Sequence, residues 1–278
     1  MAAHINGPLN YERLGKQGRP MVFVHPNPMD LSCWVYQMAH FSTWFRTIGI
    51  DLPGYGHSPT ASPGLTMEDV AQACWEVVDE AVGDEPCILV GLSVGVSVVQ
   101  HMANQRPGQT LAVIMTGSGY QPVKDFAFKR IEQYGEQGVA FRYQHAFEDY
   151  SPAFRETDYA RYFATLFTER NQWADAATIM EQFRALSVPD PDWLFEGMKA
   201  PSLIITGSED NSHQPAFALQ DRIAGCELVT IQGAGHACNM EQPWEWDMAA
   251  LAFLRKHGLV EAPDESVPVG PSAPAGSA

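Results

Sequence analysis

The feature that most constrains the fold is a serine between two glycines, placed where an apolar run meets a helix-forming segment. Residues 87–90 read C-I-L-V, residues 91–95 read G-L-S-V-G, and residues 94–104 have the apolar spacing of a helix. A short apolar run bounded by glycine is typical of a buried strand. The sequence therefore predicts a strand, a sharp turn with Ser93 at its apex, and a helix that begins directly after the serine.

Similar apolar runs recur along the chain, with helix-length segments between them. Strands are predicted at 21–24, 46–50, 87–90, 111–115, 202–205 and 227–231, and helices at 31–42, 67–82, 94–104 and 241–256. Thr66 and Asp69 have the spacing of a capping box for the second of these helices. Buried strands that alternate with helices predict an α/β fold, with a mostly parallel, doubly wound sheet covered on both faces.

One segment interrupts this alternation. Residues 120–198 contain no run that is typical of a buried strand, but they carry many aromatic side chains in an amphipathic helical pattern. We therefore expect an α/β core formed by residues 1–119 and 199–260, with residues 120–198 as a helical cap or lid. Residues 261–278 are rich in Pro, Ala, Ser and Gly, and we expect them to be disordered.

Composition narrows the possible partners. The net charge of −16 disfavours binding to nucleic acid and to anionic membrane surfaces. No apolar run reaches about 18 residues, so no membrane span is expected, and the N-terminus lacks the pattern of a signal peptide.

The five cysteines form no CxxC pair, which favours free thiols in a reducing compartment and predicts a cytoplasmic protein. The nine histidines show no metal-ligand spacing, so neither a metal nor another cofactor is expected.

Two further strand ends supply partners for Ser93. A serine hydroxyl needs a base that takes its proton, and a small-residue loop, G-A-G at 233–235, places His236 after the strand at 227–231. The base needs a carboxylate to orient it, and Asp210 follows the strand at 202–205. The carboxyl ends of parallel strands meet at one edge of a sheet, so the sequence predicts a triad of Ser93, Asp210 and His236.

Other residues could serve as the base or as the carboxylate. His213 and His57 are the rival bases, although a surface position is expected for both. Glu209 is the rival to Asp210, and either acid could instead be a solvated loop residue.

The order Ser…Asp…His, together with the glycine-flanked serine, resembles the α/β-hydrolase fold superfamily, in its serine-nucleophile branch with a helical cap. The stretch D-L-P-G-Y-G-H-S at 51–58 resembles a turn of that family, and residues 5–15 resemble its first hairpin. The likeness spans nearly the whole chain outside 120–198 and the tail. It implies the fold but no substrate, because this fold hosts many chemistries.

The resemblance also implies an oxyanion hole. In the family, the residue after the nucleophile, here Val94, supplies one backbone N–H, and the loop after the strand at 21–24 supplies another. That loop reads V-H-P-N-P-M-D at 24–30, where the family usually has His-Gly at the position of His25 and Pro26. Because proline has no N–H, we expect Asn27 to be the loop's donor, with its side chain as a possible third donor and the Met29 N–H as the alternative. His25 and Met29 are expected to support the loop or to line the substrate pocket.

These residues predict a cofactor-independent serine hydrolase that acts on a small-molecule carboxylic ester or lactone through an acyl-enzyme. Relatives that open epoxides or displace halide have aspartate in place of the serine, so Ser93 disfavours both activities. The aromatic cap suggests a small to medium, mostly apolar or aromatic substrate, although more than half of these aromatics are expected to form the cap's own core. A C–C bond hydrolase of a diketone-type substrate, or a ligand receptor on a hydrolase scaffold, remains an alternative. The sequence does not define the oligomeric state.

Overall fold

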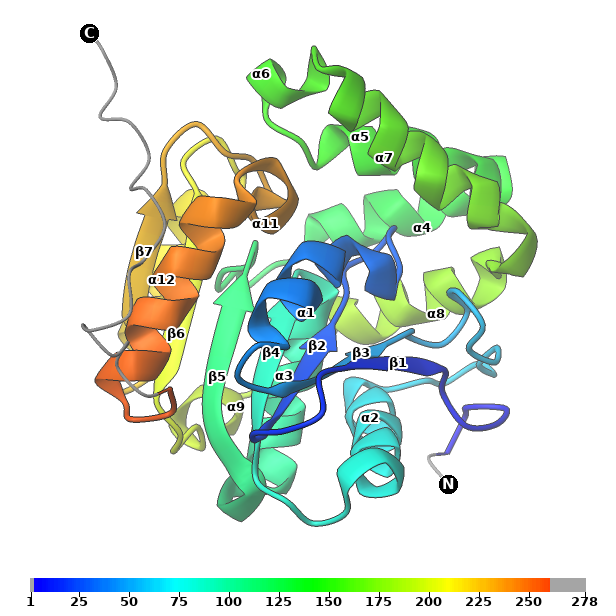
Figure 1. The fold of residues 1–278 in the computed structure, drawn as a ribbon. Coiled ribbons are helices and arrows are strands. Elements are labelled where there is room, and N and C mark those ends of the chain that lie inside the picture. Colours follow the sequence, from blue (N-terminus) through cyan, green and yellow to red (C-terminus); the bar gives the residue numbers. More distant parts are fainter. Residues whose placement is uncertain (1–2, 261–278) are drawn as a thin grey trace, which may run out of the picture.

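A seven-stranded sheet forms the centre of the molecule (Figure 1). The computed structural model describes residues 3–260. The strands lie in the order β1-β3-β2-β4-β5-β6-β7, and all neighbouring pairs are parallel except β1 and β3. Their bounds are β1 Tyr11–Leu14, β2 Pro20–Val24, β3 Arg46–Ile50, β4 Cys87–Leu92, β5 Thr110–Thr116, β6 Ser202–Gly207 and β7 Glu227–Ile231. The predicted α/β fold with a mostly parallel sheet is confirmed.

The central strands are apolar throughout because both faces of the sheet are covered. In β2, Val22 and Val24 belong to one core, whereas Met21 and Phe23 belong to the core on the opposite face. The first core includes side chains from α2 (Met67–Val82), α3 (Val94–Gln105) and α10 (His213–Arg222). The second includes side chains from α1 (Val35–Phe41), α11 (Cys238–Glu241) and α12 (Pro243–Lys256). Figure 1 shows α1 and α12 together on one face of the sheet.

Helices alone fill the stretch between β5 and β6, all of which the structure describes. They are α4 Asp125–Gln137, α5 Arg142–Glu148, α6 Pro152–Arg155, α7 Asp158–Glu169, α8 Ala176–Ser187 and α9 Trp193–Glu196. Helix α4 packs on α8 and α5 packs on α7. In Figure 1, α4 to α8 gather beyond one end of the sheet, and we refer to residues 120–198 as the cap. Its separation from the core as a domain stays a prediction.

The local predictions differ from the structure in two places. The expected helix over 241–256 begins two residues later, at Pro243, and Glu241 instead ends the short helix α11, because Pro243 disfavours a helical conformation in Gln242. The expected hairpin at the N-terminus is absent from the described residues: Ile5 forms an isolated bridge with Ala61, and β1 pairs with β3. The predicted capping box of Thr66 and Asp69 is present at the start of α2.

The expected disordered tail, 261–278, lies outside the described residues. None of the helices in the described part of the chain combines the length and apolar character needed to cross a membrane.

Candidate active site

Ser93 lies at a strained turn between β4 and α3. Its φ of 56° and ψ of −116° place a non-glycine residue in a conformation that L-residues rarely adopt. The two flanking glycines permit the turn: a Cβ on Gly91 would lie 2.4 Å from the Gly95 carbonyl oxygen, and one on Gly95 would lie 2.3 Å from the Val24 carbonyl oxygen. The predicted strand, turn and helix are therefore all present, with the serine at the N-terminus of α3.

His236 and Asp210 meet at the ends of β7 and β6. His236 Nδ1 lies 3.0 Å from Asp210 Oδ1 and 3.2 Å from Oδ2. The Ser212 N–H donates to Asp210 Oδ1 at 2.9 Å, and the Ser212 hydroxyl donates to Oδ2. Burial opposes ionisation of Asp210, but the charge of His236 and the hydrogen bonds from His236 and Ser212 hold the pKa of this carboxyl below its usual value. A fixed, ionised carboxylate can therefore orient the imidazole.

The structure brings Ser93 and His236 to one cavity, which has a volume of about 800 Å³. Among the described residues, Ser93 Oγ makes no hydrogen bond to His236. Catalytic hydrogen bonds are often longer before a substrate is bound, so this geometry remains compatible with a nucleophile and its base.

The rival residues do not share this arrangement. Neither His57 nor His213 lines the cavity, and their rings instead lie 5.4 Å from the ring of Trp173 and 5.3 Å from that of Phe217, respectively. Glu209 lines the cavity, but it is exposed and has no hydrogen bond to His236 within residues 3–260.

The cap contributes a second carboxyl group beside His236. The backbone carbonyl of Asp149 accepts hydrogen bonds from the N–H groups of His236, at 2.9 Å, and Ala237, at 3.3 Å. The Asp149 side chain lines the cavity, and its Oδ2 is buried without a hydrogen-bond partner among the described residues. Burial raises the pKa of Asp149 to about 7, against the charge of His236.

This environment makes His236 unusually basic. Burial disfavours its protonation, but the charge of Asp210, the hydrogen bond to Asp210 and the charge of Asp149 raise the pKa of His236 to about 9.

Among the described residues, two with unpaired backbone N–H groups line the same cavity. Val94 is the first residue of α3, so its N–H has no partner within the helix. Asn27 also lines the cavity, and within residues 3–260 its backbone N–H has no hydrogen-bond partner. The alternative donor is occupied, because the Met29 N–H donates to the Pro26 carbonyl at 3.1 Å and Met29 does not line the cavity. The structure thus favours Asn27 over Met29.

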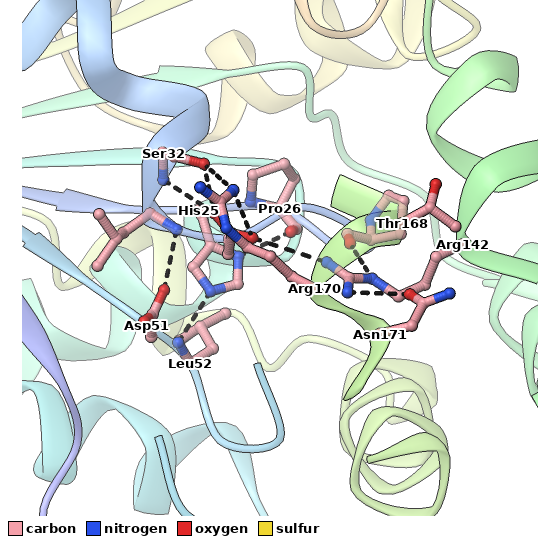
Figure 2. A network of polar contacts seen from close by, with 12 residues as sticks. His25, Pro26, Ser32, Asp51, Leu52, Arg142, Thr168, Arg170 and Asn171 are labelled. Carbon is pink, nitrogen blue, oxygen red and sulfur yellow. Dashed lines mark hydrogen bonds and ion pairs between the residues drawn. The ribbon is translucent and has the colours of Figure 1, made fainter. Parts of the chain in front are cut away.

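His25 supports this loop, as expected, and lies outside the cavity. It is completely buried, and its Nε2 accepts from the Leu52 N–H at 2.8 Å while Nδ1 lies 2.8 Å from the Pro26 carbonyl oxygen (Figure 2). A ring that accepts at Nε2 and donates at Nδ1 is neutral, and burial lowers the pKa of His25. His25 therefore ties the loop after β2 to the turn after β3.

The cap holds the other side of the loop. Buried Arg142, at the start of α5, donates from Nε to the Pro28 carbonyl at 2.8 Å and from a terminal nitrogen to Asn171 Oδ1 at 3.2 Å (Figure 2). Arg170 donates to both Asp30 oxygens, at 3.2 and 3.3 Å, and to the Ser32 hydroxyl at 2.8 Å. Residues 27–32 are thereby held between the core and the cap.

The sequence of the chain matches the group described as the Alpha/beta hydrolase family over residues 21–246. The chain belongs to this family.

Other proteins resemble this alpha/beta hydrolase more distantly. It is 29% identical to polyketide synthase ThaQ of Burkholderia thailandensis over 214 residues, which cover 73% of this chain but only 10% of that protein. A thermophilic esterase from Thermogutta terrifontis (malate bound) has a TM-score of 0.77 and 24% identity, covering 90% of this chain and 93% of the esterase. The enol-lactonase from Burkholderia xenovorans LB400 has a TM-score of 0.79 and 20% identity, covering 90% and 98%. At these identities, the solved structures show the fold alone.

The lining of the cavity differs from the expectation of a mostly apolar or aromatic substrate. Polar and charged side chains outnumber aromatic ones, and the aromatic side chains of the cap that line the cavity are Phe126, Tyr150, Phe183 and Phe195. Others, such as Tyr134, Phe141 and Phe167, are buried in the interior of the cap. Aromatic content alone could not distinguish these two locations.

Sequence reasoning missed three residues of this alpha/beta hydrolase's site. Ser212 has a recognisable signal, because a serine two residues after an aspartate can close an Asx turn on it. Asp149 and Arg142 have none, since they reach the site from a distant segment whose placement depends on tertiary packing. Within residues 3–260, no three histidine, cysteine, aspartate or glutamate side chains are grouped so as to hold a metal ion.

Proposed function

We propose that this alpha/beta hydrolase is a cofactor-independent serine hydrolase that cleaves a carboxylic ester or lactone through an acyl-enzyme. The observation that carries the proposal is the strained Ser93 turn opening into the same cavity as the His236–Asp210 pair. A strained serine at a helix N-terminus, with a carboxylate-oriented imidazole in the same cavity, is the arrangement that nucleophilic acyl transfer needs.

In the proposed acylation step, His236 Nε2 takes the Ser93 proton as Oγ attacks the substrate carbonyl carbon. Negative charge develops on the carbonyl oxygen, and the N–H groups of Asn27 and Val94 stabilise it. The intermediate then collapses, the C–O bond to the alcohol breaks, and His236 returns the proton to the departing oxygen. Asp210 stays ionised throughout and stabilises the imidazolium.

In the proposed deacylation step, His236 takes a proton from water, and the resulting hydroxide attacks the acyl carbon. Collapse of the second intermediate returns the proton to Ser93 and releases the carboxylic acid. Water supplies all the atoms that are added, so the cycle needs no cofactor.

The two structural neighbours are an esterase and an enol-lactonase, which is compatible with this proposal. The fold hosts many chemistries, so the proposal rests on the site rather than on these names. Cleavage of a C–C bond beside a ketone would use the same three side chains, and a ligand receptor would keep them with little turnover. No contact among the described residues favours either alternative.

The test is hydrolysis of p-nitrophenyl acetate and butyrate by the wild type and by Ser93→Ala. We expect Ser93→Ala to lower kcat by about 10⁴-fold or more, because the nucleophile is lost while the cavity remains. A Ser62→Ala variant, which changes a serine that does not line the cavity, serves as the matched control and should keep the burst and steady-state phases. Equal hydrolysis by wild type and Ser93→Ala would contradict the proposal, and a burst without further turnover would favour a receptor.

A further inference from the structure

The cavity continues from Ser93 along the buried face of α3. Ser93, Ser97 and Gln100 all line it and are four and three residues apart, which places them on one face of the helix. With a rise of 1.5 Å per residue, Ser97 and Gln100 lie about 6 and 10 Å beyond Ser93 along the helix axis. The polar stripe therefore runs away from the proposed nucleophile, where part of an ester substrate would extend.

Both polar side chains on this stripe lack hydrogen-bond partners. Ser97 is 7% exposed and Gln100 is 4% exposed, yet Ser97 Oγ and Gln100 Nε2 have no partner within residues 3–260. The backbone carbonyl oxygens of these two residues, by contrast, have nearby side-chain partners. That of Ser97 lies 2.8 Å from His101 Nδ1, and that of Gln100 accepts a hydrogen bond from the Asn104 side chain at 2.8 Å. Neither side chain thus has a visible structural role.

Buried polar atoms without partners are unusual in folded proteins, because the water they lose on folding is not replaced. Such an atom facing a cavity can recover its hydrogen bond from a ligand. A serine hydroxyl and an amide nitrogen can both donate, so a ligand group that satisfies both is an oxygen acceptor.

The surroundings favour a neutral acceptor. Lys124 and Arg130, which also line the cavity, are already bound to carboxylates: Lys124 to Asp190 at 2.7 Å and Arg130 to Glu148 at 2.7 Å. Phe195, from α9, which packs on α3, adds an apolar wall. The subsite thus combines neutral donors with apolar contact surface.

We propose that Ser97 and Gln100 form a subsite that binds a carbonyl oxygen of the substrate, several bonds from the scissile ester or lactone carbonyl. The subsite makes this enzyme specific for oxo-substituted esters over plain alkyl esters of the same length. This proposal rests on the proposed serine hydrolase function.

The experiment compares p-nitrophenyl 6-oxoheptanoate with p-nitrophenyl heptanoate, which has the same chain length without the keto oxygen. We expect the wild type to prefer the oxo ester by at least about tenfold in kcat/KM, because a site built to hydrogen-bond a group discriminates against the analogue that lacks it. Gln100→Leu, of similar size, should abolish most of that preference by slowing the oxo ester, and Ser97→Ala should reduce it. Gln105→Leu, an exposed position on the same helix, should leave the preference unchanged.

Two results would overturn the subsite while leaving the proposed function in place. Ser93-dependent hydrolysis of both esters at equal kcat/KM would overturn the subsite and leave the serine hydrolase standing. A preference that stays at its wild-type size in a folded Gln100→Leu or Ser97→Ala protein would also overturn the subsite.

If neither ester is hydrolysed in a Ser93-dependent way, the proposed function fails for these esters, and calorimetry decides on the subsite. Tighter binding of 6-oxoheptanoate than of heptanoate, lost in Gln100→Leu, would support the subsite, and equal binding of the two acids would overturn it. Thermal unfolding of each variant checks that it is folded, and the smaller Ser97→Ala change keeps the comparison available if Gln100→Leu does not fold.

Discussion

Two carboxyl groups affect the pKa of His236, and they have different environments. Asp210 receives hydrogen bonds from His236 and Ser212, which hold its pKa below the usual value despite burial. Asp149 is partly exposed, but its Oδ2 is buried without a donor among the described residues, and burial raises its pKa to about 7. Two acids beside one base can thus be in different protonation states near neutral pH. Asp210 is suited to orient the base and Asp149 to tune its pKa.

The pH dependence of kcat/KM follows from the sign of these effects. His236 accepts a proton only when neutral, and its pKa is raised to about 9, so kcat/KM should rise as pH increases through about 9. Asp149 contributes negative charge that favours the imidazolium, so Asp149→Asn should lower the pKa of His236 and move this rise to lower pH. Glu209→Gln, which removes an exposed acid from the same cavity, is the control and should leave the profile in place. A profile for Asp149→Asn that superimposes on the wild type would contradict the assignment.

The proposed oxyanion hole depends on one backbone N–H in the loop after β2. Asn27→Pro removes that donor, and we expect kcat to fall by about 10²- to 10³-fold with the protein still folded. Asn27→Ala keeps the N–H and removes only the side-chain amide, so its loss should be smaller. Comparison of kcat for the two variants, with thermal unfolding as the check on folding, makes the measurement. Near-wild-type turnover in a folded Asn27→Pro protein would show that the hole is built elsewhere.

For single residues of the site, the sequence predicts the position of those that directly follow a strand. Ser93, Asp210 and His236 could be placed near one another because parallel strands end at a common edge. The expectation for Asn27 needed only the absence of proline N–H groups beside it. Asp149 could not be predicted, since its position depends on how the cap docks.

Among the elements, α5 links the loop that carries the proposed oxyanion donor to the loop that carries His236. At its start, Arg142 donates to the Pro28 carbonyl of the oxyanion loop. Just after its end, the Asp149 carbonyl receives the N–H groups of His236 and Ala237. Glu241 reinforces the second connection by accepting from the N–H groups of Ser151, at 3.0 Å, and Gly235, at 3.1 Å. Helix α5 therefore fixes the distance between the proposed oxyanion hole and the proposed base.

Arg142 is accordingly a positioning residue. We expect Arg142→Gln to lower kcat by about 10- to 100-fold with a smaller change in KM, because the loop shifts while the rest of the cavity is intact. Arg142→Lys keeps the charge but loses the Nε–H, so it should recover little of the rate. Arg161→Gln, at an exposed position of α7, is the control and should leave both constants unchanged. If Arg142→Gln raised KM alone, the residue would be binding substrate rather than positioning the loop.

The predictability of the elements depended on their packing. Strands of the sheet were placed to within one or two residues, because burial on both faces gives continuous apolar runs. The capping box of α2 was found from two side chains. The prediction of an N-terminal hairpin is wrong because Ile5 and β1 both pair with distant parts of the chain. Such long-range pairing leaves no local pattern.

In the whole molecule, the cavity is a product of the cap and the core together. Its lining includes Ser93, Gln100 and His236 from the core and Lys124 and Asp149 from the cap. The sequence predicted both parts, but not which cap residues face inward. That is why the chain's aromatic content suggested a more apolar site than the one observed.

The central claim is that Ser93 is a nucleophile activated by His236 and Asp210. The most direct measurement is labelling of the full chain with a fluorophosphonate, followed by peptide mass spectrometry and a time course for each variant. We predict a stoichiometric adduct on Ser93, no adduct in Ser93→Ala, and much slower labelling in His236→Ala and Asp210→Asn. Ser62→Ala, a control outside the cavity, should be labelled at the wild-type rate. An adduct on a different serine, or labelling of Ser93 that is equally fast without His236, would contradict the account.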